Sequence, residues 1–294
     1  MMRRFGVVAG LAMAAASVLV AQAPATEIYL APFSEAGAKV TVGRAANITN
    51  NPGYDNQPQF LADSSGILFS SNRDGAQSDV YRYDIALKKI VQVTATSDNE
   101  NSPTLTPDGR TFTTVRGSAQ RLWRYTLDGE DAGLAWTHQG LIGYHVWVSP
   151  TQLATFILGA QRQPATLQLL DMRSGASTVI ESSIGRSLLM RPGRGTVSFV
   201  HKPQGAPWQI KELDPVTRTV TALTPTLEGS EDLAWTPAGS IVMGQKSKLF
   251  LWRPAAGGWT EIADLSRQGV GNITRLTVSP DGKWIAVVGQ APAQ

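Results

Sequence analysis

One motif of about 43 residues recurs along nearly the whole chain, and this repeat restricts the possible folds most strongly. Each copy contains a large apolar residue, here called the anchor, then a short turn and an apolar strand; the turn reads Pro-Asp-Gly at 107–109 and 280–282. Successive anchors are separated by 45, 42, 43, 45 and 43 residues. The six anchors are Phe60, Leu105, Trp147, Met190, Trp235 and Val278. A regular period of this length is typical of repeat architectures.

A second series of segments, with apolar and polar residues in alternation, lies between successive anchors. Period-two alternation indicates strands with one buried face. The segments are 80–84, 122–126, 167–171, 210–214 and 249–253. Each unit therefore reads as four short antiparallel strands, which is the size of one propeller blade. Residues 26–294 have room for six such blades in a single domain and for no seventh.

The two ends of the chain each supply half a blade. Val278 is followed by only 16 residues, enough for about two strands. Segments 28–32 and 39–49 resemble the two outer strands that are missing there. We therefore predict an all-β, six-bladed β-propeller whose last blade is shared by residues 27–49 and 270–290. This closure removes the free sheet edges that would invite aggregation.

Several segments carry a family resemblance. Residues 50–60, 67–75 and 79–81 closely resemble a blade of the TolB-like propellers, a WD-like repeat family, and 102–109 and 278–282 resemble its next diagnostic stretch. The resemblance implies the same six-bladed fold. TolB itself resembles a propeller preceded by a separate α/β domain, which we expect this chain to lack. For that reason the partner-binding roles of TolB in the Tol–Pal system are not carried over.

The first 25 residues read as a secretory signal peptide. Two Arg residues precede the apolar run Phe5–Val20, and small residues suit cleavage after Ala23 or, preferably, Ala25. An uncleaved membrane anchor is the alternative, but the run is short for a span of about 20 residues. We expect a periplasmic or secreted protein that has no stable membrane insertion after cleavage.

Composition excludes several classes of function. The formal charge is +3, and removal of the signal peptide with its two Arg residues leaves +1. A nearly neutral chain without runs of Lys or Arg is not typical of nucleic-acid binders. The chain has no cysteine, which excludes disulfides, a thiol nucleophile and thiolate metal sites.

The loops that enter the innermost strands are the predicted site, because propellers bind ligands at the mouth of the central channel and loops on rigid scaffolds carry function. The candidate ligand- or partner-binding residues are Asp55, Asn56, Glu100, Asn101, Tyr144, His145, Arg186, Glu231, Asp232 and Arg275. The alternative is that the short polar side chains only satisfy turn backbones.

Evidence for catalysis in the sequence is thin. His145 could be a base, or a metal ligand with Glu231 and Asp232, but such roles need several convergent groups and a structural histidine is favoured. There is no nucleophile elbow, zinc-protease motif or phosphate loop. Segment 72–79 faintly resembles a calcium loop, although a hairpin turn explains it as well. The tryptophans, notably Trp147 and Trp235 at anchors, could stack on sugars but are predicted to be core.

The sequence therefore favours a non-catalytic scaffold in the cell envelope that binds a protein or peptide at the channel mouth, with no cofactor, no metal and no assigned oligomeric state. The alternative is a propeller enzyme, a metal-assisted hydrolase or lyase with its site at the same mouth. A sensor or partner subunit for a separately encoded hydrolase rests on analogy alone.

Overall fold

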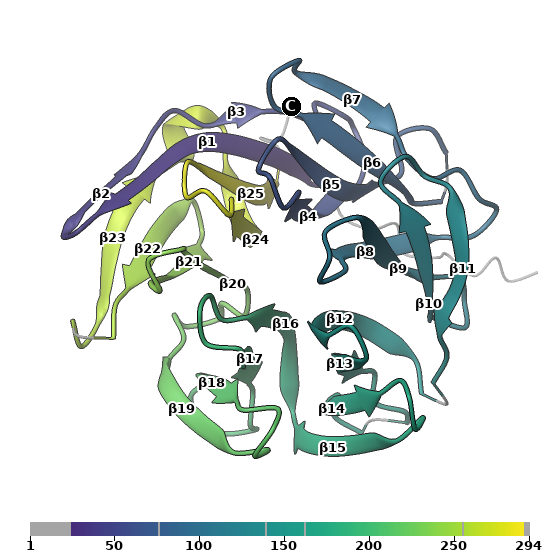
Figure 1. Cartoon of the computed structure of the whole chain (residues 1–294). Helices are drawn as coiled ribbons and strands as arrows, with labels where there is room; N and C mark the ends of the chain where they lie inside the picture. Colours follow the sequence, from purple (N-terminus) through teal and green to yellow (C-terminus); the bar gives the residue numbers. More distant parts are fainter. Residues whose placement is uncertain (1–24, 76, 139, 162, 255, 291–294) are drawn as a thin grey trace, which may run out of the picture.

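The computed structural model describes residues 25–290 except 76, 139, 162 and 255. They form six antiparallel sheets arranged as blades around a central axis (Figure 1). The predicted all-β, six-bladed propeller is confirmed. The predicted signal peptide lies outside the described residues, apart from its last residue.

In each blade, four strands run side by side from the channel to the rim. The innermost strands are β4 (Asp55–Phe60), β8 (Glu100–Leu105), β12 (Ile142–Ser149), β16 (Ile184–Met190), β20 (Leu233–Trp235) and β24 (Gly271–Val278). The second strands are β5 (Gly66–Ser71), β9 (Thr111–Arg116), β13 (Gln152–Ile157), β17 (Val197–His201), β21 (Ile241–Gln245) and β25 (Trp284–Gln290). The third strands are β6 (Asp79–Asp84), β10 (Arg121–Thr126), β14 (Thr166–Asp171), β18 (Gln209–Leu213), β22 (Lys248–Trp252) and β1 (Glu27–Ala36). The outermost strands are β7 (Lys89–Gln92), β11 (Asp131–Trp136), β15 (Ser177–Ser182), β19 (Val220–Pro225), β23 (Trp259–Asp264) and β2 (Lys39–Val42).

Two short elements complete the chain: β3 (Ala46–Asn47), which also pairs with β1, and the 3-10 helix η1 (Ser266–Gln268). The face of the ring at which the innermost strands begin is called the mouth face below, and the opposite face, where they end, is called the far face.

The Pro-Asp-Gly signal forms the hairpin between the innermost and second strands. The amide of Gly109 donates to the carbonyl of Thr106 at 2.9 Å, and the amide of Gly282 donates to Ser279 at the same distance. Both glycines have a positive φ, 66° and 69°. This left-handed conformation costs glycine little because it has no Cβ, which explains the recurrence of the residue at this point of the repeat.

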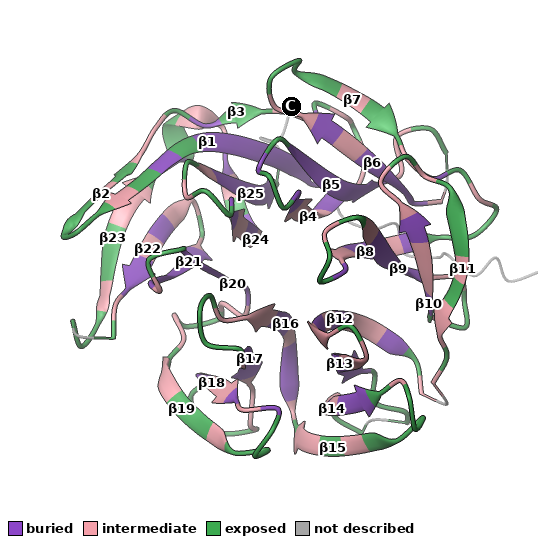
Figure 2. Ribbon diagram, viewed as in Figure 1, coloured by how far each residue is buried: buried purple, intermediate pink, exposed green. Residues whose placement is uncertain are grey.

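Hydrophobic side chains fill the spaces between neighbouring blades. The second strands are almost entirely buried, the innermost strands are partly buried along the channel, and the outermost strands are the most exposed (Figure 2). Each buried cluster combines residues from two adjacent blades; one joins Phe199 of blade four to Leu169 of blade three, for example. Blades therefore stabilise one another, and the loss of one would expose apolar faces on both neighbours.

The N-terminal strand closes the ring as predicted. β1 pairs with β25 in register from Glu27 opposite Gly289 to Pro32 opposite Trp284, while β2 pairs with the second half of β1. The side chains of β1 alternate between two inter-blade clusters. Leu30 packs in the cluster shared with blade one, and Tyr29 in the cluster shared with blade five. The strand is thus buried on both faces, as a closing strand must be.

Polar contacts reinforce this closure. Thr236 and Ser240 of blade five each donate a hydroxyl hydrogen bond to Glu35 at 2.6 Å, and the guanidinium of Arg253 lies 3.2 Å from the same carboxylate. The side chain of Glu35 is only 6% exposed. A buried carboxylate is tolerated because these partners replace its lost hydration.

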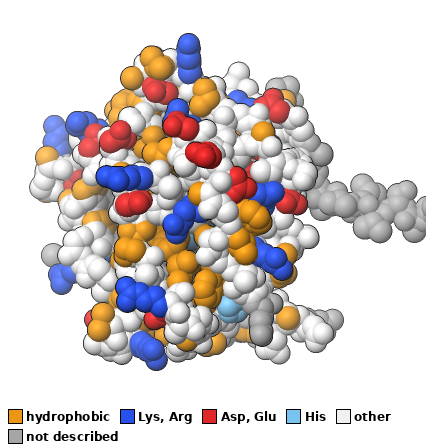
Figure 3. All heavy atoms as spheres, turned by 45° about the vertical axis from the view of Figure 1, so that its right-hand side comes forward, with side chains coloured by type: hydrophobic (Ala, Val, Ile, Leu, Met, Phe, Trp, Pro, Cys, Tyr) orange, Lys and Arg blue, Asp and Glu red, His pale blue; other side chains and the backbone are white. Residues whose placement is uncertain are grey.

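The surface shows no single-sign field on the side drawn in Figure 3, where acidic and basic side chains are interspersed with hydrophobic ones. Among the described residues, no helix has the length and apolar character that a membrane span requires.

We predict that Leu30→Ala, in the closing strand, lowers the free energy of unfolding by about 2–5 kcal/mol, because Leu30 is buried between two blades. Leu134→Ala is the matched control, since Leu134 lies in an outermost strand and is 48% exposed. Urea denaturation measures both. If both variants lowered the free energy of unfolding by the same small amount, the packing of β1 would not stabilise the ring.

Candidate functional site

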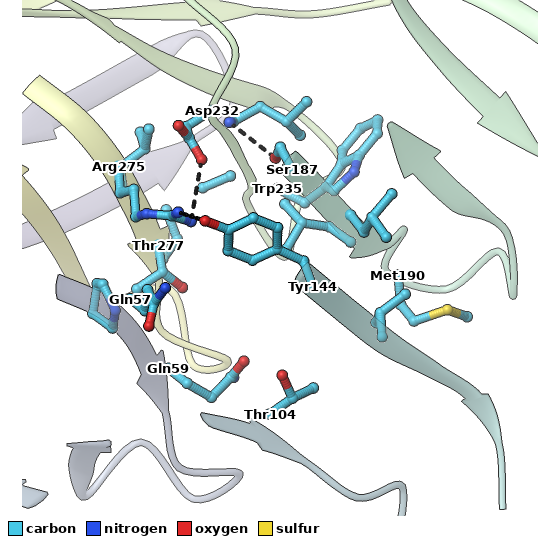
Figure 4. A pocket seen from close by; sticks show the side chains of 18 of the residues that line it. Gln57, Gln59, Thr104, Tyr144, Ser187, Met190, Asp232, Trp235, Arg275 and Thr277 are labelled. Atoms are coloured by element: carbon cyan, nitrogen blue, oxygen red, sulfur yellow. Dashed lines mark hydrogen bonds and ion pairs between the residues drawn. The ribbon is translucent and has the colours of Figure 1, made fainter. Parts of the chain in front are cut away.

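Two positions in or directly before every innermost strand line the central channel. The third residue before each anchor forms what we call the mouth ring: Gln57, Ser102, Tyr144, Ser187, Asp232 and Arg275. The residue directly before each anchor forms the inner ring: Gln59, Thr104, Val146, Leu189, Ala234 and Thr277. The spacing of two follows from the alternation of side chains along a strand. Together the rings enclose a cavity of about 450 Å³, here called the channel cavity (Figure 4).

A hydrogen bond spans the channel between opposite blades. The guanidinium of Arg275, on β24 of blade six, donates to the hydroxyl of Tyr144, on β12 of blade three, at 2.7 Å (Figure 4). The guanidinium carbon also lies 4.9 Å from the centre of the Tyr144 ring. The tyrosine is supported from behind by an edge-on contact with Phe156 at 5.6 Å. This contact divides the channel at the level of the mouth ring.

Arg186 and Asp232 form the tightest ion pair at the mouth. Nε and Nη2 of Arg186 both donate to Oδ2 of Asp232, at 2.9 and 2.6 Å, and Nη2 also donates to the carbonyl of Thr274 at 2.9 Å. Burial alone lowers the pKa of Arg186, but the charge and hydrogen bonds of Asp232 outweigh it and raise that pKa above its ordinary value. The guanidinium is therefore a permanent cation that ties blades four, five and six together.

A second cavity, of about 580 Å³, opens on the mouth side of this ion pair. We call it the outer cavity; it is lined by loops of blades four, five and six, including Trp208, Glu228 and Lys246. Arg186 and Asp232 line both cavities, so they form the partition between them. Polar and charged side chains predominate here, which suits a partner that keeps part of its hydration.

Lys202 forms, with Arg186, Glu231 and Asp232, what we call the charged group. Its ammonium lies 2.6 Å from Glu231 and 4.1 Å from the centre of the Trp208 ring, and Glu231 also lies 3.4 Å from Arg186. With Arg186, Arg275 and Asp232, these residues place three cations and two carboxylates around the partition. The excess positive charge belongs to Arg275, whose Nη1 is 3.6 Å from Asp232.

Comparisons with known proteins identify the fold. No protein-family model matches the chain, and no curated protein matches it. Among solved structures, a protein assigned as TolB from Agrobacterium tumefaciens superposes with a TM-score of 0.68 and 15% identity, over 92% of this chain and 100% of the other. TolB from Acinetobacter baumannii gives a TM-score of 0.57 and 14% identity, over 90% of this chain and 64% of that chain.

The chain has the fold of a TolB-like propeller. The same fold occurs in an oligogalacturonate lyase in complex with manganese, with a TM-score of 0.58 and 14% identity, over 84% of this chain and 80% of the lyase. At these identities the similarity concerns the fold, and the function has to be argued from the residues of this propeller.

The structure brings six of the ten predicted site residues to the cavities of the propeller. Tyr144, His145, Arg186, Asp232 and Arg275 line the channel cavity, and Glu231 lines the outer cavity. The other four line neither cavity: Asp55, Asn56, Glu100 and Asn101. They lie at the beginnings of β4 and β8, one or two residues before the mouth ring.

Asp55 and Glu100 occupy equivalent positions in blades one and two and are fully buried. Asp55 lies 3.1 Å from Arg73, and Glu100 accepts a hydrogen bond from the hydroxyl of Tyr125, with Arg116 at 3.9 Å. Burial raises the pKa of both carboxyl groups. Each has partners from its own blade, so these groups stabilise the beginnings of the strands.

The two asparagines also have hydrogen-bond partners within the protein. Oδ1 of Asn56 accepts the amide of Gln57 at 2.8 Å, and Oδ1 of Asn101 accepts the hydroxyl of Ser78 at 3.0 Å. The first contact satisfies a backbone amide, as the alternative interpretation expects, whereas the second joins blade two to a side chain of blade one.

His145 is a buried structural residue. Its Nε2 lies 2.6 Å from the hydroxyl of Thr113, which also accepts the indole N–H of Trp147 at 3.0 Å. Burial lowers the pKa of His145 to about 3. The imidazole is therefore neutral at physiological pH.

The residues of the alternative metal-ligand set do not converge: Glu231 and Asp232 pair with cations, and His145 contacts Thr113. Across the described ranges, no group of three or more His, Asp or Glu side chains is arranged to hold a metal ion. The anchors Trp147 and Trp235 are buried core residues as predicted, 4% and 6% exposed.

Sequence reasoning missed Lys202, Trp208 and Tyr54. Lys202 and Trp208 belong to the hairpin between β17 and β18, on the mouth face of blade four, and the repeat has no fixed position that predicts them. Tyr54 precedes β4; burial raises its pKa to about 12, and the positive charge of Arg275 lowers that pKa in part. The fixed offset of three residues before each anchor would have identified the whole mouth ring.

We predict that His145 makes this propeller less stable in acid. The unfolded histidine takes up a proton below its ordinary pKa of 6.5, while the folded one stays neutral down to about pH 3. The unfolded state therefore binds more protons in this window, and stability falls as the pH falls. Between about pH 6 and 4 the free energy of unfolding of the wild type should drop by up to about 1.4 kcal/mol per pH unit more than that of His145→Gln. Parallel pH profiles of the two proteins would contradict this.

Proposed function

We propose that this chain is an exported, non-catalytic binding scaffold of the cell envelope that holds a protein or peptide partner at the mouth face. The proposal includes the signal peptide at residues 1–25, a periplasmic or secreted location, and the propeller as the single domain that follows. The supporting observation is the charged group of Arg186, Lys202, Glu231 and Asp232 beside the outer cavity.

The charged group suits recognition because its geometry is already set. Arg186, on blade four, contacts blade five through the Asp232 side chain and blade six through the Thr274 carbonyl, so it loses little freedom when a partner binds. Its side chain is still 31% exposed, and those of Lys202 and Glu231 are 27% and 20% exposed. Interspersed charges of both signs select a complementary partner more than they raise general affinity.

The enzyme alternative keeps one observation in its favour, the fold shared with a lyase that was solved with manganese. Addition of Mn²⁺ to the purified protein, followed by thermal unfolding and metal analysis, separates the two readings. The scaffold proposal expects no retained metal and no manganese-dependent rise in melting temperature. A stoichiometric bound metal would favour the enzyme.

Site-specific photo-cross-linking in cells of the native source tests the scaffold proposal. A photoreactive residue in place of Glu228, which is exposed at the outer cavity, should give one discrete adduct with an envelope protein. The matched control replaces Val216, which is 89% exposed in the β18–β19 turn on the far face. Arg186→Gln in the Glu228 background should lower the yield about tenfold, the effect of losing about 1.4 kcal/mol of binding free energy. The same adducts from both positions, or none from either, would overturn the proposal.

A further inference from the structure

We propose that the channel cavity is a second binding site, for a small carboxylate with an apolar body whose carboxylate group pairs with Arg275. The site lies inside the ring, below the partition formed by Arg186 and Asp232. It does not depend on partner binding at the mouth face.

Arg275 is the cation that the fold leaves incompletely paired. Its side chain is only 13% exposed, which makes an uncompensated charge costly. In the described part of the chain, Asp232 is the one carboxylate within 4 Å, and the nearest oxygen is 3.6 Å away, beyond hydrogen-bond distance. The other oxygen of Asp232 already accepts two hydrogen bonds from Arg186. A ligand carboxylate would supply the missing negative charge.

The present partner of Arg275 can be exchanged. The hydroxyl of Tyr144 is a neutral acceptor and does not offset the charge of the guanidinium, whereas a carboxylate offers an opposite charge and two parallel hydrogen bonds. Tyr144 approaches from the opposite blade, so a rotation of its side chain would release the guanidinium without breaking a strand. A carboxylate entering the cavity would then take the place of the hydroxyl.

The side chains that line the cavity determine which chemical group can accompany the carboxylate of the ligand. Leu189, Met190, Trp235 and Val278 form an apolar wall on the side of blades four to six. Gln57, Gln59 and Thr104, from blades one and two, face them across the channel (Figure 4). The volume of about 450 Å³ lies within the range of small-molecule sites. A ligand with an apolar body can pack against the apolar wall while the carboxylate at its end pairs with Arg275.

The far face provides an opening. Pro192, Pro237 and Pro280, in the turns that follow three of the innermost strands, line the cavity and are exposed. A ligand would therefore enter at the far face and meet Arg275 at the deep end, while a protein partner occupies the mouth face.

Titration calorimetry at low salt, with phenylacetate and hexanoate as probes, tests this inference on the wild-type protein. Each probe is compared with its neutral amide, phenylacetamide or hexanamide, which has nearly the same shape. We expect the carboxylates to bind at least tenfold more tightly than the amides. Equal affinities, or no detectable binding of either carboxylate, would overturn the proposal without any variant.

Three variants locate the site. Arg275→Gln should reduce carboxylate affinity at least tenfold and leave amide affinity nearly unchanged. Thr104→Trp should abolish the binding of both probes by filling the cavity, and Arg110→Gln, at an exposed residue of a far-face turn, should change neither. Carboxylate binding that survives both Arg275→Gln and Thr104→Trp would place the site elsewhere and refute the proposal. The melting temperature of each variant confirms that it is folded.

Discussion

The antiparallel pairing of β1 with β25 is the contact on which the ring depends. It joins residues 27–32 to 284–289, and so connects the two ends of the described chain in one sheet. Because β1 is buried between blade five and blade one, its removal would expose apolar surface on two sides. The site depends on the same pairing: Tyr144 and Arg275 belong to opposite blades and meet only when the circle is closed.

The charges at the mouth follow from how a propeller distributes side chains. Each blade contributes one residue to the mouth ring, so blades five and six place Asp232 and Arg275 side by side without any local sequence signal. Burial of such charges is costly unless they are paired. Arg186 satisfies Asp232 and leaves Arg275 with a neutral hydroxyl. Arg275 is thus the incompletely paired guanidinium of the site, with a charged outer cavity on one side of the partition and a partly apolar cavity on the other.

The repeat predicted most of the fold because its signals are local. Proline and glycine at 107–109 and 280–282 fix hairpins, and the spacing of the anchors fixes the number of blades. The closing strand was predictable because the last blade was visibly incomplete.

The orientation of several site residues could not be predicted from the repeat. Gln57 and Ser102 have positive φ values, 58° and 56°, at bulges that turn their side chains into the channel. Asp55 and Glu100, two residues earlier, consequently lie buried beside the arginines of their own blades. The spacing of the anchors predicts the blade to which a residue belongs, but the bulge determines the direction of its side chain. The contact between Tyr144 and Arg275 forms only when the ring is closed.

Hydrogen exchange of the backbone amides in β1 tests the central claim most directly, namely that this strand closes the ring and so assembles the channel. If the account is correct, the amides of Tyr29 and Ala31, which face β25, exchange only through global unfolding, as slowly as those of a second strand such as β13. Exchange of β1 through a local opening, with β13 still protected, would show that the ring holds together without its closing strand and would contradict the account.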